Sequence, residues 1–234
     1  GGGPHKVYDV DARLRPEGGN SPLAVSIDEY QRYFEKRASV WERLALVRAS
    51  SIAGTKSLGD DVGALLQEFA YGPAFTRDQV DEIMKIRKTM IAQSLKRYPD
   101  MVDVKSGEGG ITDIDFIAQA YAASYGSAYP PIRHRDTPGI LDALGKEKLI
   151  DRHDAATCTE QYFFLTAVEK AIRIGSGKSV NVLPKSGSEL LRVMRLMDFD
   201  NVRRFQRRLN DVRTLTRELY DRWMYRLMEY SGEK

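Results

Sequence analysis

Two acidic and two basic side chains alternate along VYDVDARLRPEG, residues 7–18. In a strand every second residue lies on the same face, so all four would point the same way: Asp9, Asp11, Arg13 and Arg15. Carboxylates on one strand face repel each other unless a cation or the arginines offset them. Carboxylates suit Mg²⁺, and guanidinium groups match phosphate. The pattern therefore fits metal-assisted phosphate chemistry, and it also fits a solvated strand face with two surface ion pairs.

A second group of candidate residues surrounds the glycine-rich loop Lys105–Gly110, which leads into an expected helix, Ile111–Tyr125. Backbone N–H groups at a helix start can hold an anion, and glycine lets a ligand approach closely. Lys105 adds a compact positive charge, while Asp113 and Asp115 complement the helix dipole. The segment indicates an anion-binding loop or, without a ligand, a well-charged helix start.

Periodicity and capping residues predict a mainly α chain after an opening β-hairpin, Lys6–Arg15 with Leu23–Ser26. Two strands alone are marginally stable in water, so we expect partner strands upstream of the chain. One expected helix, from Thr76 to about Tyr98, has Val80, Ile83, Ile86, Met90 and Leu95 inward. The other expected segments are a helix capped by Ser26, Trp41–Ile52, Asp60–Tyr71, Pro138–Leu144 capped by Thr137, Asp151–Ile174, a loop at Gly175–Lys185, Ser188–Met197 and Asn201–Met228.

Composition narrows the class of protein. The 234 residues are 42% apolar with a net charge of +3, which supports a sizeable core and argues against bulk polyanion binding. Cys158 is the single cysteine, so no intrachain disulfide forms and a cytoplasmic location is expected. No apolar run is long enough to span a membrane. The basic segment 201–228 also carries acidic partners, so we expect a salt-bridged face or a protein contact there rather than nucleic acid.

Four motifs follow one another in the first half of the chain. Residues 8–16 read YDVDARLRP, with Gly18 and then SPL at residues 21–23. Residues 41–49 read WERLALVRA, residues 86–90 read IRKTM, and residues 103–116 read DVKSGEGGITDIDF. In this order they resemble the signature motifs of the glutamine-synthetase adenylyltransferases, and the joint pattern is more specific than any single motif. The later helices fit that family in pattern only.

The resemblance implies a fold and a reaction. The fold is mainly α, with a short β-hairpin remnant of a polymerase-β-like nucleotidyltransferase sheet (residues 1–54, the distal part of that domain) followed by a helical bundle (residues 55–234). The reaction is the transfer of AMP from ATP to a tyrosine of glutamine synthetase, or its phosphorolytic removal, with Mg²⁺ bridging carboxylates and phosphates. Glutamine synthetase and a PII-type signalling protein are the implied partners.

The resemblance also implies roles for individual residues. Asp11 would be the catalytic carboxylate and third metal ligand, with Asp9 a bystander. The implied nucleotide-binding residues are Arg13, Arg15, Arg48, Lys105 and Asp113, the last of which would orient Lys105 or Arg48 or cap a helix. The first two metal carboxylates belong to an upstream G-S … D-x-D motif that does not precede Val7, so the chain is expected to be a truncated, inactive piece. Asp115 stands where the family usually has glutamate.

Two alternatives remain open at this point. One is an enzyme of the same mechanism that uridylylates a PII-type signalling protein. The other is a helical protein-interaction module that keeps the strand without catalysis.

Overall fold

The fold is taken from a computed structural model, which describes residues 15, 17–18 and 22–231. In chain order its elements are α1 (Ile27–Lys36), α2 (Val40–Leu46), α3 (Lys56–Ala70), α4 (Arg77–Arg97), β1 (Met101–Asp103), α5 (Ile111–Tyr125), the 3-10 helix η2 (Pro130–Ile132), α6 (Thr137–Lys146), α7 (Arg152–Ser176), β2 (Val182–Pro184), α8 (Ser188–Leu196) and α9 (Val202–Tyr230). The predicted mainly α fold is confirmed. None of the described helices is long and apolar enough to cross a membrane.

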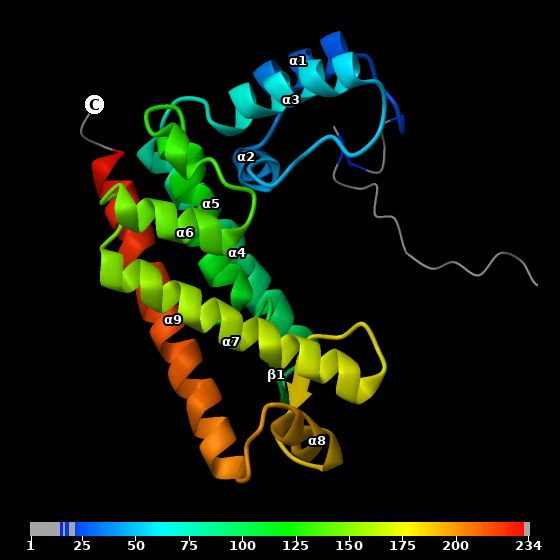
Figure 1. Cartoon of the computed structure of the whole chain (residues 1–234), viewed down its shortest axis with the longest axis vertical. Coiled ribbons are helices and arrows are strands. Elements are labelled where there is room, and N and C mark those ends of the chain that lie inside the picture. The colour runs from blue at the N-terminus through cyan, green and yellow to red at the C-terminus, as the bar shows by residue number, and fades with distance from the viewer. Residues whose placement is uncertain (1–14, 16, 19–21, 232–234) are drawn as a thin grey trace, which may run out of the picture.

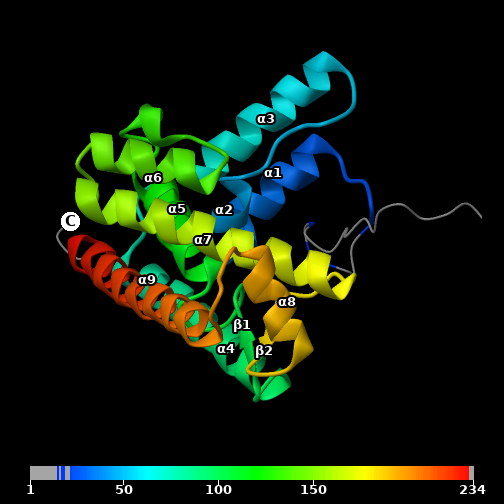
Figure 2. The same ribbon diagram turned by 60° about the horizontal axis from the view of Figure 1, so that its bottom comes forward.

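Helix α5 is the centre of the large hydrophobic core. It is rich in alanine and isoleucine, and 12 of its 15 residues are buried. Helices α6 and α7 run one above the other across it, and α9 lies along α7 (Figures 1 and 2). A helix that is buried on nearly all sides needs neighbours on nearly all sides, so α5 fixes the positions of the helices around it.

Helices α1 and α3 lie side by side and form a separate lobe (Figures 1 and 2). They share a small core of Tyr33, Phe34 and Leu66, in which the rings of Phe34 and Phe69 stack at 4.4 Å. Leu46 at the end of α2 packs against both this core and the large one. The small core draws on residues before and after position 54, where the domain boundary is predicted, and that division stays a prediction.

Helix caps explain where most helices begin. Ser26 accepts a hydrogen bond from the Glu29 amide, and Thr76 forms a reciprocal capping box with Gln79, both as expected. The prediction that Thr137 caps the helix after it is wrong. Asp136 is the cap, because its carboxylate accepts from the Gly139 amide at 2.8 Å. Thr137 is the first helical residue, and its hydroxyl is free for another contact.

The small sheet of the described chain joins two segments that are distant in sequence. Strands β1 and β2 pair antiparallel, with Val102 opposite Leu183. Strand β2 lies inside Gly175–Lys185, which was expected to be a loop. The expected strand Leu23–Ser26 is not formed: Leu23 lies in a bend, and the segment has no sheet partner among the described residues. Its predicted partner Lys6–Arg15 lies outside the described residues except for Arg15, whose carbonyl accepts from the Gly18 amide at 2.8 Å.

Helix α4 presents an unexpected residue to the interior. Val80 and Ile83 are buried as predicted, but Leu95 is 65% exposed, so its inward placement is wrong. Arg87 is instead fully buried on this helix. A buried guanidinium requires a partner of opposite charge and several hydrogen-bond acceptors, and the glycine-rich loop supplies both.

Candidate functional site

The glycine-rich loop is folded around the carboxylate of Asp103 at its start. One oxygen of Asp103 accepts from the backbone amides of Lys105 at 3.0 Å and Ser106 at 2.9 Å. The other accepts from the Ser94 hydroxyl of α4 at 2.6 Å. Because these bonds fix the backbone at Lys105, they set the direction in which its side chain leaves the loop.

A second buried carboxylate, Asp113 in the first turn of α5, closes the loop from the other side. Its Oδ1 accepts from Arg87 Nε at 2.6 Å, and its Oδ2 accepts from the Gly109 amide at 2.7 Å. Arg87 also donates to the carbonyls of Ser106 at 2.8 Å and Gly107 at 2.7 Å. The side chains of Asp113 and Arg87 are both 0% exposed. Burial raises the pKa of Asp113, and the charges of Arg87 and Arg217 oppose that rise.

The loop glycines serve close packing of the backbone. Gly109 has φ +67°, and a Cβ there would lie 2.0 Å from the carbonyl oxygen of Arg213 on α9. The first amides of α5 are also engaged within the loop, since Ile111 and Thr112 each donate at 3.0 Å to the carbonyls of Val104 and Lys105. These amides are thus engaged by the loop itself, and the exposed side chains of the loop are those of Lys105 and Glu108.

Two cations and two carboxylates meet where α2, the glycine-rich loop, α5 and α7 approach one another. We call Arg48, Lys105, Asp115 and Glu169 the charged cluster. Arg48 Nη1 lies 3.5 Å from Asp115 Oδ1, and Lys105 Nζ lies 3.9 Å from Glu169 Oε1. The cations are 43% and 48% exposed, against 16% and 13% for the carboxylates. The two cations therefore face solvent, and the two carboxylates lie beneath them, closer to the protein interior.

Each carboxylate of the cluster is held by a further partner. The Thr137 hydroxyl donates to Asp115 at 2.6 Å, and Arg173 Nη2 lies 2.7 Å from Glu169 Oε1. Burial raises the pKa of Asp115, whereas Thr137, Arg48 and Lys105 act to lower it. The ionised form of Asp115 thus depends on its neighbouring donor and cations. The two carboxylates are held in place, whereas the two cations are half-exposed and weakly paired. A phosphate group can therefore bind Arg48 and Lys105 by replacing the carboxylates as their partner.

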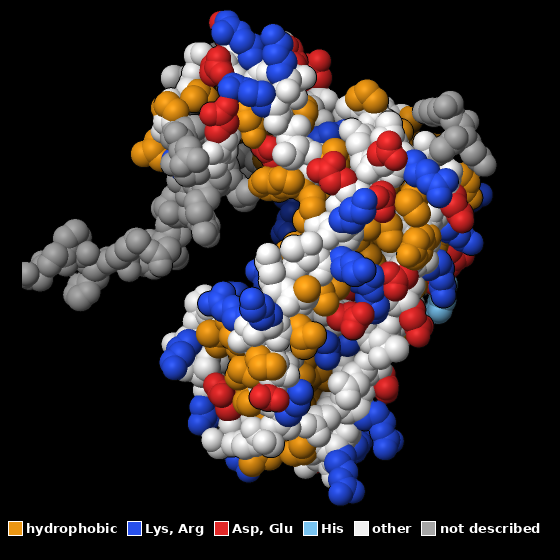
Figure 3. All heavy atoms as spheres, turned by 180° about the vertical axis from the view of Figure 1, so that it is seen from behind, with side chains coloured by type: hydrophobic (Ala, Val, Ile, Leu, Met, Phe, Trp, Pro, Cys, Tyr) orange, Lys and Arg blue, Asp and Glu red, His pale blue; other side chains and the backbone are white. Residues whose placement is uncertain are grey.

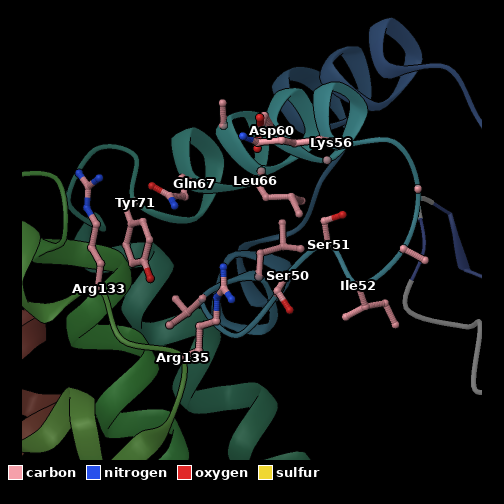
Figure 4. A pocket seen from close by; sticks show the side chains of 18 of the residues that line it. Ser50, Ser51, Ile52, Lys56, Asp60, Leu66, Gln67, Tyr71, Arg133 and Arg135 are labelled. Atoms are coloured by element: carbon pink, nitrogen blue, oxygen red, sulfur yellow. The ribbon is translucent and has the colours of Figure 1, made fainter.

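A hollow of about 1030 Å³ lies next to the segment that carries Arg48, although no residue of the charged cluster lines it. It is lined by Val47 and Ala49 on either side of Arg48, by the start of α3, and by residues 133–135 just before α6. Figure 4 shows Arg133 and Arg135 on one side of the hollow, across from Gln67, Asp60 and Lys56 of α3. Its size matches that of small-molecule sites.

The molecule is also hollowed on the face seen in Figure 3. The lobe of α1 and α3 stands apart from the end that carries α8. Lys and Arg side chains are visible at the back and the lower edge of the hollow between them. The charged side chains visible in this hollow are thus mainly basic.

The predicted site residues fall into four groups. Arg48 and Lys105 are brought together in the charged cluster, as the prediction of shared phosphate contacts requires. Asp113 lies outside the cluster and pairs with Arg87 and Arg217, not with Arg48 or Lys105. Arg15 is half-buried in its turn. The two others, Asp11 and Arg13, lie outside the described residues, so their roles stay predictions.

Three residues of the site escaped the sequence reasoning. Thr137 precedes a proline as a helix cap would, and Glu169 is one of three acids on a long helix, so neither carries a local signal of a site. Arg87 stands in the quoted motif at residues 86–90, where its position could have marked it, but no role was assigned to it. All three act through contacts with residues distant in sequence, which local patterns do not reveal.

Two family models match the chain. Residues 3–64 match the model described as glutamate-ammonia ligase adenylyltransferase. Residues 78–224, most of the helical part, match the model described as GlnD PII-uridylyltransferase.

Several curated relatives match nearly the whole chain, and each is described as a bifunctional glutamine synthetase adenylyltransferase/adenylyl-removing enzyme. The relative from Agrobacterium fabrum is 31% identical over 97% of this chain and 23% of its own length. Those from Streptomyces avermitilis and Methylococcus capsulatus are 28% and 29% identical over 94% and 92% of this chain, and 22% of their own lengths. The chain thus spans about a fifth of the length of these relatives.

Proposed function

Because the chain belongs to the glutamine synthetase adenylyltransferase family, we propose that it forms part of an enzyme that moves AMP between ATP and a tyrosine of glutamine synthetase. The membership confirms the resemblance of the four motifs. The observation that carries the proposal is the meeting of Arg48 and Lys105, from two of those motifs, in one charged cluster.

In this proposal the charged cluster receives the phosphates of the nucleotide. Arg48 offers a planar guanidinium that can bind two phosphate oxygens at once, and Lys105 offers a compact charge beside it. Asp115 and Glu169 keep the two cations in place before the nucleotide arrives. Asp113 has a positioning role, because its bonds to Arg87 and Gly109 hold the loop from which Lys105 extends.

The proposed Mg²⁺ ligand and catalytic carboxylate is Asp11, with Arg13 and Arg15 as further phosphate contacts. Within the described ranges, no group of three His, Cys, Asp or Glu side chains is placed to hold a metal ion. The proposed share of the described residues is to bind phosphate and to position the loop. We assign the opening segment to the distal part of a nucleotidyltransferase domain and the helices after residue 54 to a bundle that faces it.

The proposed setting is a cytoplasmic one, with glutamine synthetase as substrate and a PII-type protein as regulator. The names of the relatives support the first partner. The match of residues 78–224 favours a second candidate function, uridylylation of a PII-type protein. The two reactions differ in both the nucleotide and the acceptor, so they are separable in one assay.

The test uses a polypeptide of the relatives' length that contains this chain. It is incubated with radiolabelled ATP or UTP and with glutamine synthetase or a PII-type protein. We expect label only from ATP and only on glutamine synthetase. Label on the PII-type protein from UTP would establish the second candidate, and no label on either protein would overturn both.

The role of Asp11 is tested in the same polypeptide. Asp11→Ala should lower AMP transfer by several orders of magnitude, because it removes a proposed metal ligand. Asp9→Ala is the matched control, two residues away on the same predicted strand face, and should retain activity. Near-normal transfer by the Asp11 variant would contradict the assignment.

A further inference from the structure

A second pocket lies at the end of the bundle remote from the charged cluster. It measures about 780 Å³ and opens between α5, the connection from α6 to α7, and the last turns of α9. In Figures 1 and 2 the red end of α9 lies beside the end of α6 and the start of α7. Arg152 at this pocket and Glu169 in the charged cluster lie about 25 Å apart along α7, since the helix rises about 1.5 Å per residue. The two sites have no residue in common.

The pocket has an aromatic interior. Tyr121 and Trp223 form its floor, with their rings edge-to-face at 6.1 Å and the tyrosine hydroxyl donating to the Trp223 carbonyl at 2.9 Å. Tyr125 and Tyr230 contribute further lining, and Tyr230 is 59% exposed. Exposed and half-buried rings around an open pocket are suited to stack on a planar ligand.

The rim of the pocket is basic. Lys146, Lys148, Arg152 and Arg226 all line it, and Asp151 is the one acid among the lining residues. Asp151 already accepts from the amides of His153 and Asp154 as the cap of α7. Lys146 pairs with Asp142, whereas the other three cations lie in no ion pair with any residue that the structure describes. The rim thus offers uncompensated positive charge next to aromatic rings.

The backbone at Lys148 gives an independent indication that its side chain is needed. Lys148 follows the end of α6 with φ +59°, a left-handed conformation. The Leu149 amide donates to the Leu144 carbonyl at 3.0 Å, which is the helix ending in which glycine is usual at this position. A lysine there carries a backbone cost that glycine would avoid, and it places a cation at the rim of the pocket.

We propose that this aromatic pocket binds a nucleoside phosphate, with the base stacked on its tyrosines and the phosphates on Lys148, Arg152 and Arg226. A ligand that is both planar and anionic is the class that satisfies the rings and the cations together. Binding at this site is separate from the proposed AMP transfer and occurs on a different part of the helical bundle.

Fluorescence of Trp223 tests the proposal directly on the 234-residue chain. The chain has two tryptophans, so Trp41→Phe leaves Trp223 as the sole reporter. Titration with ADP should quench its emission saturably. In that background Lys148→Gly should weaken binding about tenfold, the loss of one charge-assisted contact, while the melting temperature stays the same or rises.

Two control variants and one competing ligand complete the experiment. Arg195→Gln on α8 and Arg48→Ala in the charged cluster should leave the quenching curve unchanged. Absence of saturable quenching at millimolar ADP would overturn the proposal, as would unaltered binding by Lys148→Gly and Arg226→Gln. Saturable quenching by an acidic, tyrosine-containing peptide but not by ADP would overturn it in favour of a peptide site.

Discussion

Two aspartates of α5, two residues apart, each pair with an arginine, but one pair is buried and the other is partly exposed. Asp113 lies 2.6 Å from Arg87, and both side chains are 0% exposed. Asp115 lies 3.5 Å from Arg48, and these side chains are 16% and 43% exposed. Residues two apart on a helix point in different directions, so the first aspartate faces the interior and the second faces the charged cluster. The pair Asp113–Arg87 thus holds the glycine-rich loop in place, whereas the pair Asp115–Arg48 leaves its arginine accessible to solvent.

The difference shows that burial decides what an ion pair does. A fully buried, hydrogen-bonded pair is costly to break and serves to hold structure. A half-exposed pair with a long separation contributes little stability, so a phosphate can take the cation at small cost.

The largest expected difference is in the free energy of unfolding that is lost when each aspartate is replaced by alanine. Asp113→Ala should lower the free energy of unfolding by about 3–5 kcal/mol, because it leaves Arg87 charged and buried. Asp115→Ala should cost about 1 kcal/mol, since its arginine is already half-exposed. Urea unfolding of both variants measures the two values. Similar losses would show that the two pairs do not differ as described.

The packing of the glycine-rich loop is tested by two glycines with the same backbone conformation. Gly109 and Gly177 have φ +67° and +65°, but only at Gly109 would a Cβ meet backbone atoms, at 2.0 Å from Arg213 O. Gly177→Ala should cost about 1 kcal/mol for the left-handed conformation alone. Gly109→Ala should cost about 2–3 kcal/mol more, because the contact between the loop and α9 must open. Equal losses of unfolding free energy would contradict the close approach.

A smaller effect is expected in the pH dependence of stability. Burial raises the folded-state pKa of Asp115, so the folded protein binds a proton there more readily than the unfolded chain does. Its contribution to stability is therefore present below the unfolded pKa of about 3.9 and is lost as pH rises through the folded pKa. Asp115→Asn should flatten that fall, and Arg48→Ala should steepen it, because the opposing cation is lost. Unfolding curves at a series of acidic pH values measure the slopes, and a steeper fall in the Asn variant would contradict the sign.

Local sequence patterns predicted most of the helices and the two cations of the charged cluster. The cap at Thr76 and the glycine-rich loop before Ile111 fell where expected, because capping and turn chemistry depend on adjacent residues. The motifs also singled out Arg48 and Lys105. The burial of Arg87, the partner of Thr137 and strand β2 were not predicted. Each depends on a contact between distant segments, which only the assembled helices define.

The central claim is that Arg48 binds nucleotide phosphate while Asp113 only maintains the fold. AMP transfer to glutamine synthetase by Arg48→Ala, in a polypeptide of the relatives' length, tests it most directly, with the exposed Arg195→Ala as control. The account predicts that kcat/KM falls about 10- to 100-fold, or about 1.4–2.7 kcal/mol, with the melting temperature unchanged. An unchanged kcat/KM in the Arg48 variant would contradict it, as would a loss matched by the Arg195 control.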